Sequence, residues 1–180
     1  MHLLIVVLLA AMYQVEPTNG TVSFTVMKWG VIREEGTFRD FRANIDFDAR
    51  AVARSRVDFD VDTASVDTKN RNRDETLRSV DFLDVAKYPL MRFRSTRVVP
   101  RSGNTADVTG NLTIHGVTKA ITVPVKLVGA RDRYAGFETT FTIDRRDFGI
   151  TGGRWVAGGP PGILGTEVTI RIVAGGVMKK

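Results

Sequence analysis

Hydrophobic and polar residues alternate along most of the chain, from about Tyr13 to Ile172. Because successive side chains of a β-strand point to opposite faces of a sheet, this period of two predicts strands that are apolar on one face only. About eight such segments occur, and turn sequences such as Ser102-Gly103-Asn104 separate them. The alternating apolar positions are Val22, Phe24 and Val26; Ala43, Ile45 and Phe47; Val57, Phe59 and Val61; Met91 and Phe93; Leu112 and Ile114; Val117, Ile121, Val123 and Val125; Phe137, Phe141 and Ile143; and Val168, Ile170 and Ile172. The pattern predicts one all-β domain, an antiparallel barrel or sandwich.

Two irregularities interrupt the alternation. Phe38 and Phe41 are three residues apart, which is out of phase for a flat strand and predicts a bulge near Arg39-Asp40. Pro124 lies inside an otherwise regular strand. Because proline has no N–H to donate, Pro124 is expected at a bulge or where the hydrogen-bond ladder is already broken.

The sequence contains one helical signal, from Asn72 to Asp84. Asn72 is a suitable N-cap residue, Glu75 follows it three positions later as in a capping box, and apolar residues with helical spacing come next. We therefore expect one short helix near 73–84, regular over about 73–78 and ended before Tyr88-Pro89.

The N-terminal segment Leu3–Met12 is an uncharged apolar run of about half the length that a membrane-spanning helix needs. It fits the apolar region of a secretory signal, although no Lys or Arg precedes it. The alternative is a buried β-strand of a cytosolic protein. We expect a signal peptide over residues 1–12, a single domain over 13–180, and a periplasmic or secreted location, with cleavage left open.

The composition excludes several kinds of chemistry. Cysteine is absent, which removes disulfides, thiolate metal sites and thiol nucleophiles. His2 and His115 are the only histidines, so a multi-histidine metal site is excluded. The net charge is +6, but bases and acids are interspersed, as in Arg131-Asp132-Arg133, which is typical of a solvated surface. The phenylalanines share the phase of the core, so we expect no nucleic-acid partner.

The strand Val57–Val61 also argues against a membrane-embedded barrel. Asp58, Asp60 and Asp62 occupy its polar phase, and a lipid-facing band cannot hold three carboxylates. We expect no transmembrane span, a solvated outer face, and an apolar interior suited to a soluble container.

Candidate catalytic and cofactor motifs are weak. The glycine-rich stretch 149–165 matches neither a Walker A loop nor a dinucleotide-binding loop, so a hairpin loop is the better interpretation. His115 lies in Thr113-Ile114-His115-Gly116, and the sequence places neither a nucleophile nor an orienting acid beside it. A hydrogen-bonded histidine near a turn is the simpler interpretation. We expect no catalytic residue, no metal and no cofactor.

Three motifs occur in order along the middle and C-terminal parts of the chain. The first runs from Arg73-Asp74-Glu75-Thr76-Leu77-Arg78-Ser79 through Asp81-Phe82-Leu83-Asp84 and Lys87-Tyr88-Pro89 to Phe93-Arg94-Ser95-Thr96. The second is Gly110-Asn111-Leu112-Thr113-Ile114-His115-Gly116-Val117-Thr118-Lys119, and the third is Asp144-Arg145 with Asp147-Phe148-Gly149-Ile150. Together they resemble the YceI family of polyisoprenoid-binding proteins, and the resemblance covers about Tyr13 to Ala174. It departs from the family at Met27-Lys28-Trp29, where Trp29 is expected to narrow one end of the pore, and at Thr166, where an Asp is usual.

The resemblance implies an extended, eight-stranded, antiparallel, lipocalin-like barrel that holds a long isoprenoid or similar lipid. From the strand phase, the expected ligand-binding residues of the pore are Phe24, Val26, Phe47, Phe59, Phe93, Leu112, Ile114, Phe137 and Phe141. The motif residues Arg73, Asp74, Arg78, Asp144, Arg145 and Asp147 have two interpretations. They bind a lipid head group, or they form a buried ion-pair network that ties the helix to the barrel, which we favour.

These observations lead to a functional hypothesis of non-enzymatic binding, transport or storage of a long apolar lipid, a polyisoprenoid or similar amphiphile. The alternative is an enzyme, an isomerase or hydrolase, that acts on a hydrophobic substrate in the same pore and uses His115 or an Asp/Arg pair. A third interpretation is an interaction module with a collapsed barrel. A homodimer is left open.

Overall fold

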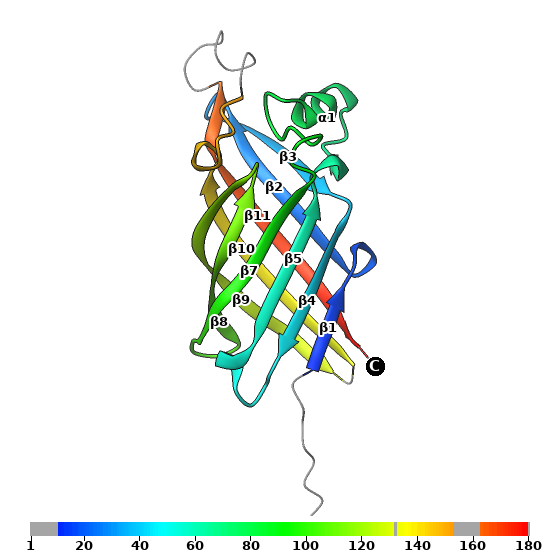
Figure 1. The fold of residues 1–180 in the computed structure, drawn as a ribbon, viewed down its shortest axis with the longest axis vertical. Coiled ribbons are helices and arrows are strands. Elements are labelled where there is room, and N and C mark those ends of the chain that lie inside the picture. The colour runs from blue at the N-terminus through cyan, green and yellow to red at the C-terminus, as the bar shows by residue number, and fades with distance from the viewer. Residues whose placement is uncertain (1–10, 132, 153–162, 180) are drawn as a thin grey trace, which may run out of the picture.

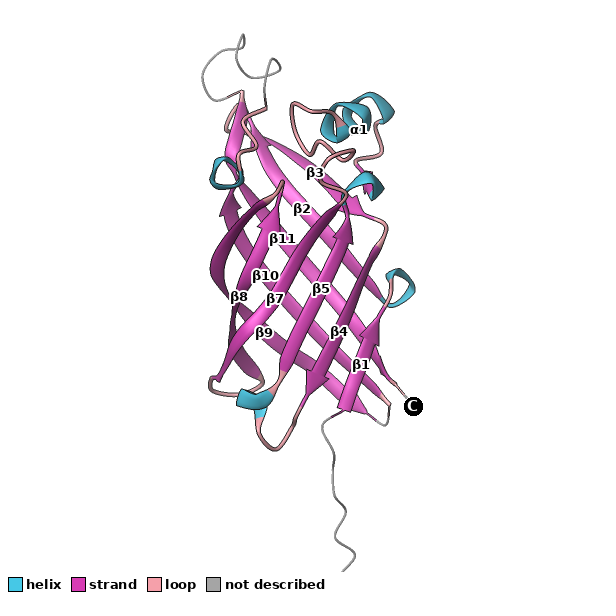
Figure 2. Ribbon diagram, in the orientation of Figure 1, coloured by secondary structure: helices cyan, strands magenta, loops and turns pink. Residues whose placement is uncertain are grey.

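The computed structural model describes residues 11–131, 133–152 and 163–179, which form an elongated β-barrel with one α-helix at one end (Figures 1 and 2). The strands are β1 (Ala11–Val15), β2 (Gly20–Lys28), β3 (Ile32–Phe38), β4 (Phe41–Phe47), β5 (Arg56–Asp62), β6 (Val66–Asp67), β7 (Leu90–Pro100), β8 (Thr105–Ile114), β9 (Val117–Arg131), β10 (Tyr134–Asp144) and β11 (Leu164–Met178), and the helix is α1 (Arg71–Arg78). Short 3₁₀ helices lie at Pro17–Asn19, Val52–Arg54, Thr63–Ser65 and Arg145–Phe148. Among the described residues, no helix is both long and apolar enough to span a bilayer.

The barrel closes through eight antiparallel strand positions, which confirms the fold predicted from the alternation and the family motifs. The order is β1-β4-β5-β7-β8-β9-β10-β11, and β11 returns to β1 through the pairing of Tyr13 with Met178. Both β1 and β2 pair with β11, so together they make up one strand position of the barrel. β4 pairs with β1 and β3 pairs with β2, so β3 and β4 together make up the next position. Each of these two positions is therefore occupied by two shorter strands in succession.

One stretch of the barrel is completed by segment 63–89, which contains β6 and α1. β3 pairs with β2 along one edge, but on its other edge it pairs only with the two residues of β6. β5 ends at Asp62, and β7 begins at Leu90. Segment 63–89 thus fills the gap between β3 and β7 at the end of the barrel where α1 lies (Figure 1).

The helix begins earlier than predicted. Its N-cap is Asn70, whose side chain accepts a hydrogen bond from the Arg73 N–H at 3.1 Å, so the expected cap at Asn72 was wrong. Glu75, expected to complete a capping box, instead accepts from Arg71 at 3.0 Å. The helix ends at Arg78, and turns rather than helix continue to Asp84.

The two irregularities fall at the expected positions, but the first is a break between strands and not the predicted bulge. Arg39 and Asp40 separate β3 from β4. The paired part of the β9–β10 ladder ends at Thr139 and Val125, so Pro124 lies where that ladder has stopped. At the N-terminus, β1 begins at Ala11 and Met12 pairs with Asp46. Of the expected signal segment 1–12, residues 1–10 lie outside the described residues, and the expected boundary after residue 12 falls inside β1.

Candidate functional site

A single large cavity of about 1130 Å³ runs through the interior of the described barrel, and its lining is overwhelmingly apolar. This volume exceeds that of most small-molecule pockets, which is about 300–1,000 Å³. The cavity is also long. β11 has 15 residues, and at about 3.4 Å per residue with a tilt near 40°, a strand of this length covers about 40 Å along the barrel axis.

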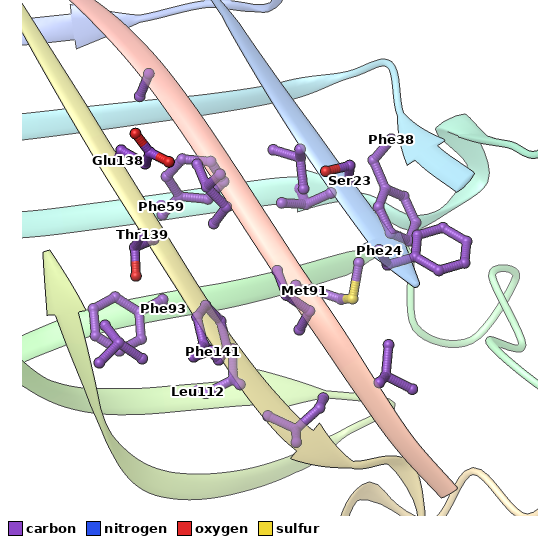
Figure 3. A pocket seen from close by; sticks show the side chains of 18 of the residues that line it. Ser23, Phe24, Phe38, Phe59, Met91, Phe93, Leu112, Glu138, Thr139 and Phe141 are labelled. Carbon is purple, nitrogen blue, oxygen red and sulfur yellow. The ribbon is translucent and has the colours of Figure 1, made fainter. Parts of the chain in front are cut away.

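All nine residues that the strand phase assigned to the pore line this cavity: Phe24, Val26, Phe47, Phe59, Phe93, Leu112, Ile114, Phe137 and Phe141. Figure 3 shows Phe59, Phe93, Leu112 and Phe141 directed into the space enclosed by the strands. Several of the phenylalanines, such as Phe93 and Phe141, are only half-buried although they point inward, because they face the open space rather than packed atoms. Their placement is as predicted, and their role in binding stays a prediction.

Glycines inside two strands let aromatic rings lie flat against the cavity wall. Gly36 pairs with Phe24 across β2 and β3, and a Cβ at Gly36 would lie 2.4 Å from the Phe24 ring. A Cβ at Gly110 on β8 would lie 2.5 Å from the ring of Phe93. Because glycine has no side chain, each ring can lie close to the strand that carries the glycine. The rings therefore extend less far into the cavity.

The α1 end of the cavity carries polar residues. Arg73 and Glu34 both line the cavity there and form an ion pair with each other. Arg73 also donates to the Thr68 hydroxyl at 2.8 Å and to the Thr68 carbonyl at 3.1 Å. Its guanidinium is therefore largely occupied by the protein.

The other two motif residues of α1 hold segment 63–89 together. The buried carboxylate of Asp74 accepts from the N–H and the hydroxyl of Thr68, both at 2.7 Å. Arg78 donates to the carbonyls of Ala64 at 2.8 Å and Val66 at 2.7 Å. These contacts support the structural interpretation of this motif.

The third motif forms a separate set around the start of β11. Arg145 is 6% exposed and donates to the carbonyls of Ile150 at 2.7 Å, Gly165 at 3.0 Å and Leu164 at 3.3 Å. Burial lowers the pKa of this guanidinium. Arg145 thus anchors the turn after β10 to β11.

The two acids of this motif pair locally. Asp144 bonds to Arg146 at 2.6 Å, and Asp147 bonds to Lys119 at 2.9 Å. The side-chain hydrogen bond from Arg146 holds the pKa of Asp144 well below its usual range. Between the described residues, no ion pair or hydrogen bond joins this set to the motif residues of α1, so the ion-pair network expected from the sequence is wrong. Two separate sets form instead, and Arg78 and Arg145 bind backbone carbonyls.

Asp67 is a buried carboxylate that the sequence analysis missed, and it lies between Val66 and Thr68, which both line the cavity. This buried residue of β6 accepts from the Lys69 ammonium at 2.8 Å, from the Lys69 N–H at 2.9 Å and from Arg39 at 2.9 Å. These bonds, with that from the Lys69 side chain largest, hold the pKa of Asp67 well below its usual range. The contact with Arg39 ties β6 to the break between β3 and β4. No local periodicity marks Asp67, because both partners of its carboxylate, Arg39 and Lys69, lie outside the strands and helices.

Two other sequence candidates lie away from the cavity lining. His115 has φ 51° in the two-residue turn between β8 and β9, and its ring lies 4.4 Å from that of Tyr88. Trp29 lies at the tip of the β2–β3 hairpin and is 53% exposed. It does not line the cavity, so the expectation that it narrows the pore was wrong. Its φ of 53° places it in a left-handed turn conformation.

The opposite end of the cavity is formed by loop residues that the strand phase does not identify. Ala49, Val52 and Ser55 contribute from the β4–β5 connection, and Gly103 and Asn104 contribute from the β7–β8 connection. Strand phase could have found other missed lining residues, such as Val98, Val108 and Ile170, but loop residues have no such period. Most of the glycine-rich stretch, residues 153–162, lies outside the described residues.

The carboxylates of β5 lie on the outer face as predicted, and Asp58 and Asp60 are paired with arginines there. Asp60 bonds to Arg94 at 2.6 Å and to Arg42 at 3.3 Å, and Arg94 lies 3.6 Å from Asp58. Arginines on the neighbouring strands β4 and β7 therefore neutralise part of this face. The sequence did not predict these ion pairs, because the partners are far apart along the chain.

Comparison with known proteins agrees with this architecture. A UPF0312 protein of Enterobacter sp. (strain 638) is 40% identical over 149 residues, which cover 79% of this chain and 77% of the relative. Protein YceI of Salmonella arizonae is also 40% identical, covering 79% of this chain and 78% of its own.

Solved structures show the same fold. Burkholderia cenocepacia BcnA matches with a TM-score of 0.83 and 28% identity over 89% of this chain and 98% of its own. A polyisoprenoid-binding domain from Saccharophagus degradans matches with a TM-score of 0.76 and 16% identity over 94% of this chain and 99% of its own, a likeness of fold alone. The model of the YceI-like domain matches residues 13–175. The chain belongs to the YceI family.

Proposed function

We propose that the interior cavity binds a long apolar lipid, a polyisoprenoid or similar amphiphile, without transforming it. The observation that carries this proposal is the apolar cavity of about 1130 Å³ that reaches from α1 to the opposite loops. A cavity of this size lined by phenylalanine, valine and isoleucine side chains offers little to a polar solute and much to a hydrocarbon chain.

The energetics favour an elongated hydrocarbon. Each buried methylene contributes about 0.8 kcal/mol relative to water, so a few isoprene units suffice for nanomolar affinity. A lipid that comes from a bilayer already has its chain in hydrocarbon, so its transfer into the cavity gains almost none of this free energy. Selectivity among lipids must therefore depend on the length and shape of the cavity and on its polar end at Arg73 and Glu34.

The family supports the lipid class, since the Saccharophagus degradans domain of the same fold is described as polyisoprenoid-binding. We assign this chain a carrier or storage role in the periplasm or outside the cell. The apolar run before β1 supports export.

A binding role is favoured over catalysis by the position of His115. It is the only histidine among the described residues, and it lies outside the cavity lining, against Tyr88. Acid–base catalysis near neutral pH would most naturally use an imidazole that contacts the substrate. Two of the titratable residues that line the α1 end, Arg73 and Glu34, are paired with each other.

Mass spectrometry of an organic extract of the purified protein tests the proposal. We expect a long-chain lipid in about equimolar amount, and the same lipid unaltered after prolonged incubation. Ile170→Trp should fill the cavity and abolish the lipid, whereas Thr169→Trp, the matched control on the outer face of β11, should retain it. An extract without lipid from protein that also takes up no added polyprenyl lipid would refute binding. A product that forms with the parent protein and is absent with His115→Gln would instead establish an enzyme.

The export proposal has its own measurement. Expression in a Gram-negative host should give a periplasmic protein that lacks about the first ten to twelve residues. The intact mass decides this: soluble cytoplasmic protein that retains Met1 contradicts export. Cleavage near residue 10 would leave β1, which begins at Ala11, complete.

A further inference from the structure

The hairpin of β2 and β3 ends in apolar side chains that face water. Trp29, Val31 and Ile32 are 53%, 78% and 42% exposed, and we call these three residues the apolar tip. The hairpin ends at the same end of the barrel as α1 (Figure 1). Single exposed apolar side chains are common on soluble proteins, whereas several together mark a surface that contacts something else.

Trp29 occupies a turn position that suits other residues better. The Val31 N–H donates to the Lys28 carbonyl at 3.2 Å, and the two residues between them, Trp29 and Gly30, have φ of 53° and 71°. Positive φ at both central residues defines a type I′ turn, for which Asn-Gly is the preferred sequence. A bulky side chain in the left-handed region destabilises the fold, so Trp29 weakens the turn that it occupies.

Little packing compensates for this strain, because the Trp29 ring is half exposed. The Lys28 ammonium lies 4.7 Å from the ring centre, and such a contact is weak at an exposed site. The backbone of the tip is nevertheless fixed, since the Trp29 N–H donates to the Ile163 carbonyl at 3.0 Å. A strained, rigidly held and exposed aromatic residue points to a role outside the fold itself.

The size and composition of the apolar tip favour a bilayer over a protein partner. A stable interface between two proteins buries about 800 Å² on each side, and three side chains of one turn supply only a small part of that area. A tryptophan beside aliphatic side chains and a lysine is typical of residues that lie at the membrane–water interface. Arg33, the next base along β3, lies 3.7 Å from Glu35, so we expect apolar insertion rather than net charge to drive the contact.

The same hairpin borders the cavity. Lys28 at the end of β2 and Glu34 on β3 line it, and so do the exposed residues Asn70 and Asn72 at the start of α1. The cavity therefore reaches the molecular surface at this end. We propose that the apolar tip inserts into the head-group region of a bilayer, which brings this mouth of the cavity to the membrane. Exchange of lipid through the mouth rests on the proposed function, whereas the docking itself does not.

Tryptophan fluorescence of the full chain with vesicles tests the docking. In Trp155→Phe, Trp29 is the only tryptophan of the chain. On vesicles of phosphatidylcholine alone, we expect the emission of Trp29 to move to shorter wavelength and to be quenched by brominated acyl chains. Because the contact is apolar, partition should change by less than about threefold between about 0.1 M and 0.5 M salt.

Trp29→Asn separates docking from a structural role. The substitution gives the turn its preferred sequence, so the urea midpoint should stay the same or rise. Partition, measured by co-sedimentation, should fall at least about tenfold, because the largest apolar side chain of the tip is lost. Val31→Asp keeps the turn residues and should weaken partition to a similar extent.

The matched control is Tyr134→Asn, which removes an exposed aromatic side chain from the opposite end of the barrel. Its partition should stay within about twofold of the parent value. Lipid content by mass spectrometry of the same samples keeps the two proposals apart. Lipid-loaded protein that does not insert refutes docking alone, and insertion by protein that never holds lipid refutes only the proposed function.

Four results overturn the docking proposal. The first is a Trp29 spectrum that does not respond to vesicles, and the second is equal weakening by Tyr134→Asn and Trp29→Asn. The third is a lower urea midpoint in Trp29→Asn, which would assign the ring to folding. The fourth comes from sedimentation velocity without vesicles: a dimeric parent and a monomeric Trp29→Asn would assign the apolar tip to a second copy of the chain.

Discussion

Phe141 and Phe148 offer a matched test of whether the barrel interior is open. Phe148 is 2% exposed, does not line the cavity, and packs with Phe82, Leu112 and Ile150. Phe141 on β10 is half-buried and lines the cavity. The same substitution, Phe→Ala, therefore removes a ring surrounded by protein in one case and a ring that borders open space in the other.

The expected costs differ by about twofold. Phe→Ala in a packed core lowers the free energy of unfolding by about 3–5 kcal/mol, because transfer energy and packing contacts are both lost. For Phe148→Ala we expect this full amount. At Phe141, one face of the ring has no protein atoms to lose, so about half of the dispersion contacts disappear and the expected cost is about 1.5–2.5 kcal/mol.

The assay is urea unfolding of lipid-free protein, obtained by solvent extraction and refolding, and followed by far-UV circular dichroism. Midpoints are converted with a common m-value, provided that the slopes of the variants agree. Addition of a polyprenyl lipid should then stabilise the parent more than Phe141→Ala, whereas Phe148→Ala should keep its lipid response. Equal costs for the two substitutions in lipid-free protein would show that the barrel is collapsed around Phe141.

Three other substitutions test contacts around the cavity. Gly36→Val places atoms where the Phe24 ring lies, so that ring must enter the cavity and lipid affinity should fall about tenfold in a titration with a fluorescent lipid; undiminished affinity would contradict the assigned path of the lipid. Asp67→Asn should lower the urea midpoint at pH 7. The pKa of Asp67 is lower in the folded state than in the unfolded state, so the charged carboxylate stabilises the fold fully above its unfolded-state pKa near 4, and this stabilisation is lost as the pH falls below that value. The difference in urea midpoint between the parent and Asp67→Asn should therefore shrink at pH 3 and stay constant between pH 6 and 8. Arg145→Gln leaves buried carbonyls without a donor and should cost about 3 kcal/mol by the same unfolding assay, with lipid content unchanged in the folded fraction.

The strand phase could be predicted from sequence because one face of each strand meets an apolar interior and the other meets water. That single constraint placed Phe24, Phe93 and Phe141 on the cavity wall. It could not show whether the interior is filled or hollow, because a packed core and a lined cavity select the same residues. The half-exposed rings in the structure distinguish the two.

The helix start shows a different limit. Asn70 and Asn72 are both suitable N-caps, and Asn72 also had Glu75 at capping-box spacing. The choice is decided by a contact outside the local sequence. Asp74 accepts two hydrogen bonds from Thr68, which fixes the chain before the helix and leaves Asn70 to cap Arg73. Local propensity therefore predicted the helix but not its first residue.

The family motifs acquire a physical reason from the hollow interior. A barrel whose interior contains a large cavity has fewer packing contacts to fix its loops and edges, so contacts at its ends contribute more to holding them. Arg78 and Asp74 bind segment 63–89 through backbone carbonyls and Thr68, and Arg145 binds the start of β11 in the same way. A buried arginine that serves several carbonyls is costly to replace, because each carbonyl then loses its donor. Motif residues at the cavity mouth can therefore be required in every lipid-free molecule, whatever head group enters. On this argument, substitution of Arg78 or Arg145 should affect the stability of lipid-free protein more than it affects lipid selectivity. A head-group role requires the larger effect to be on lipid selectivity.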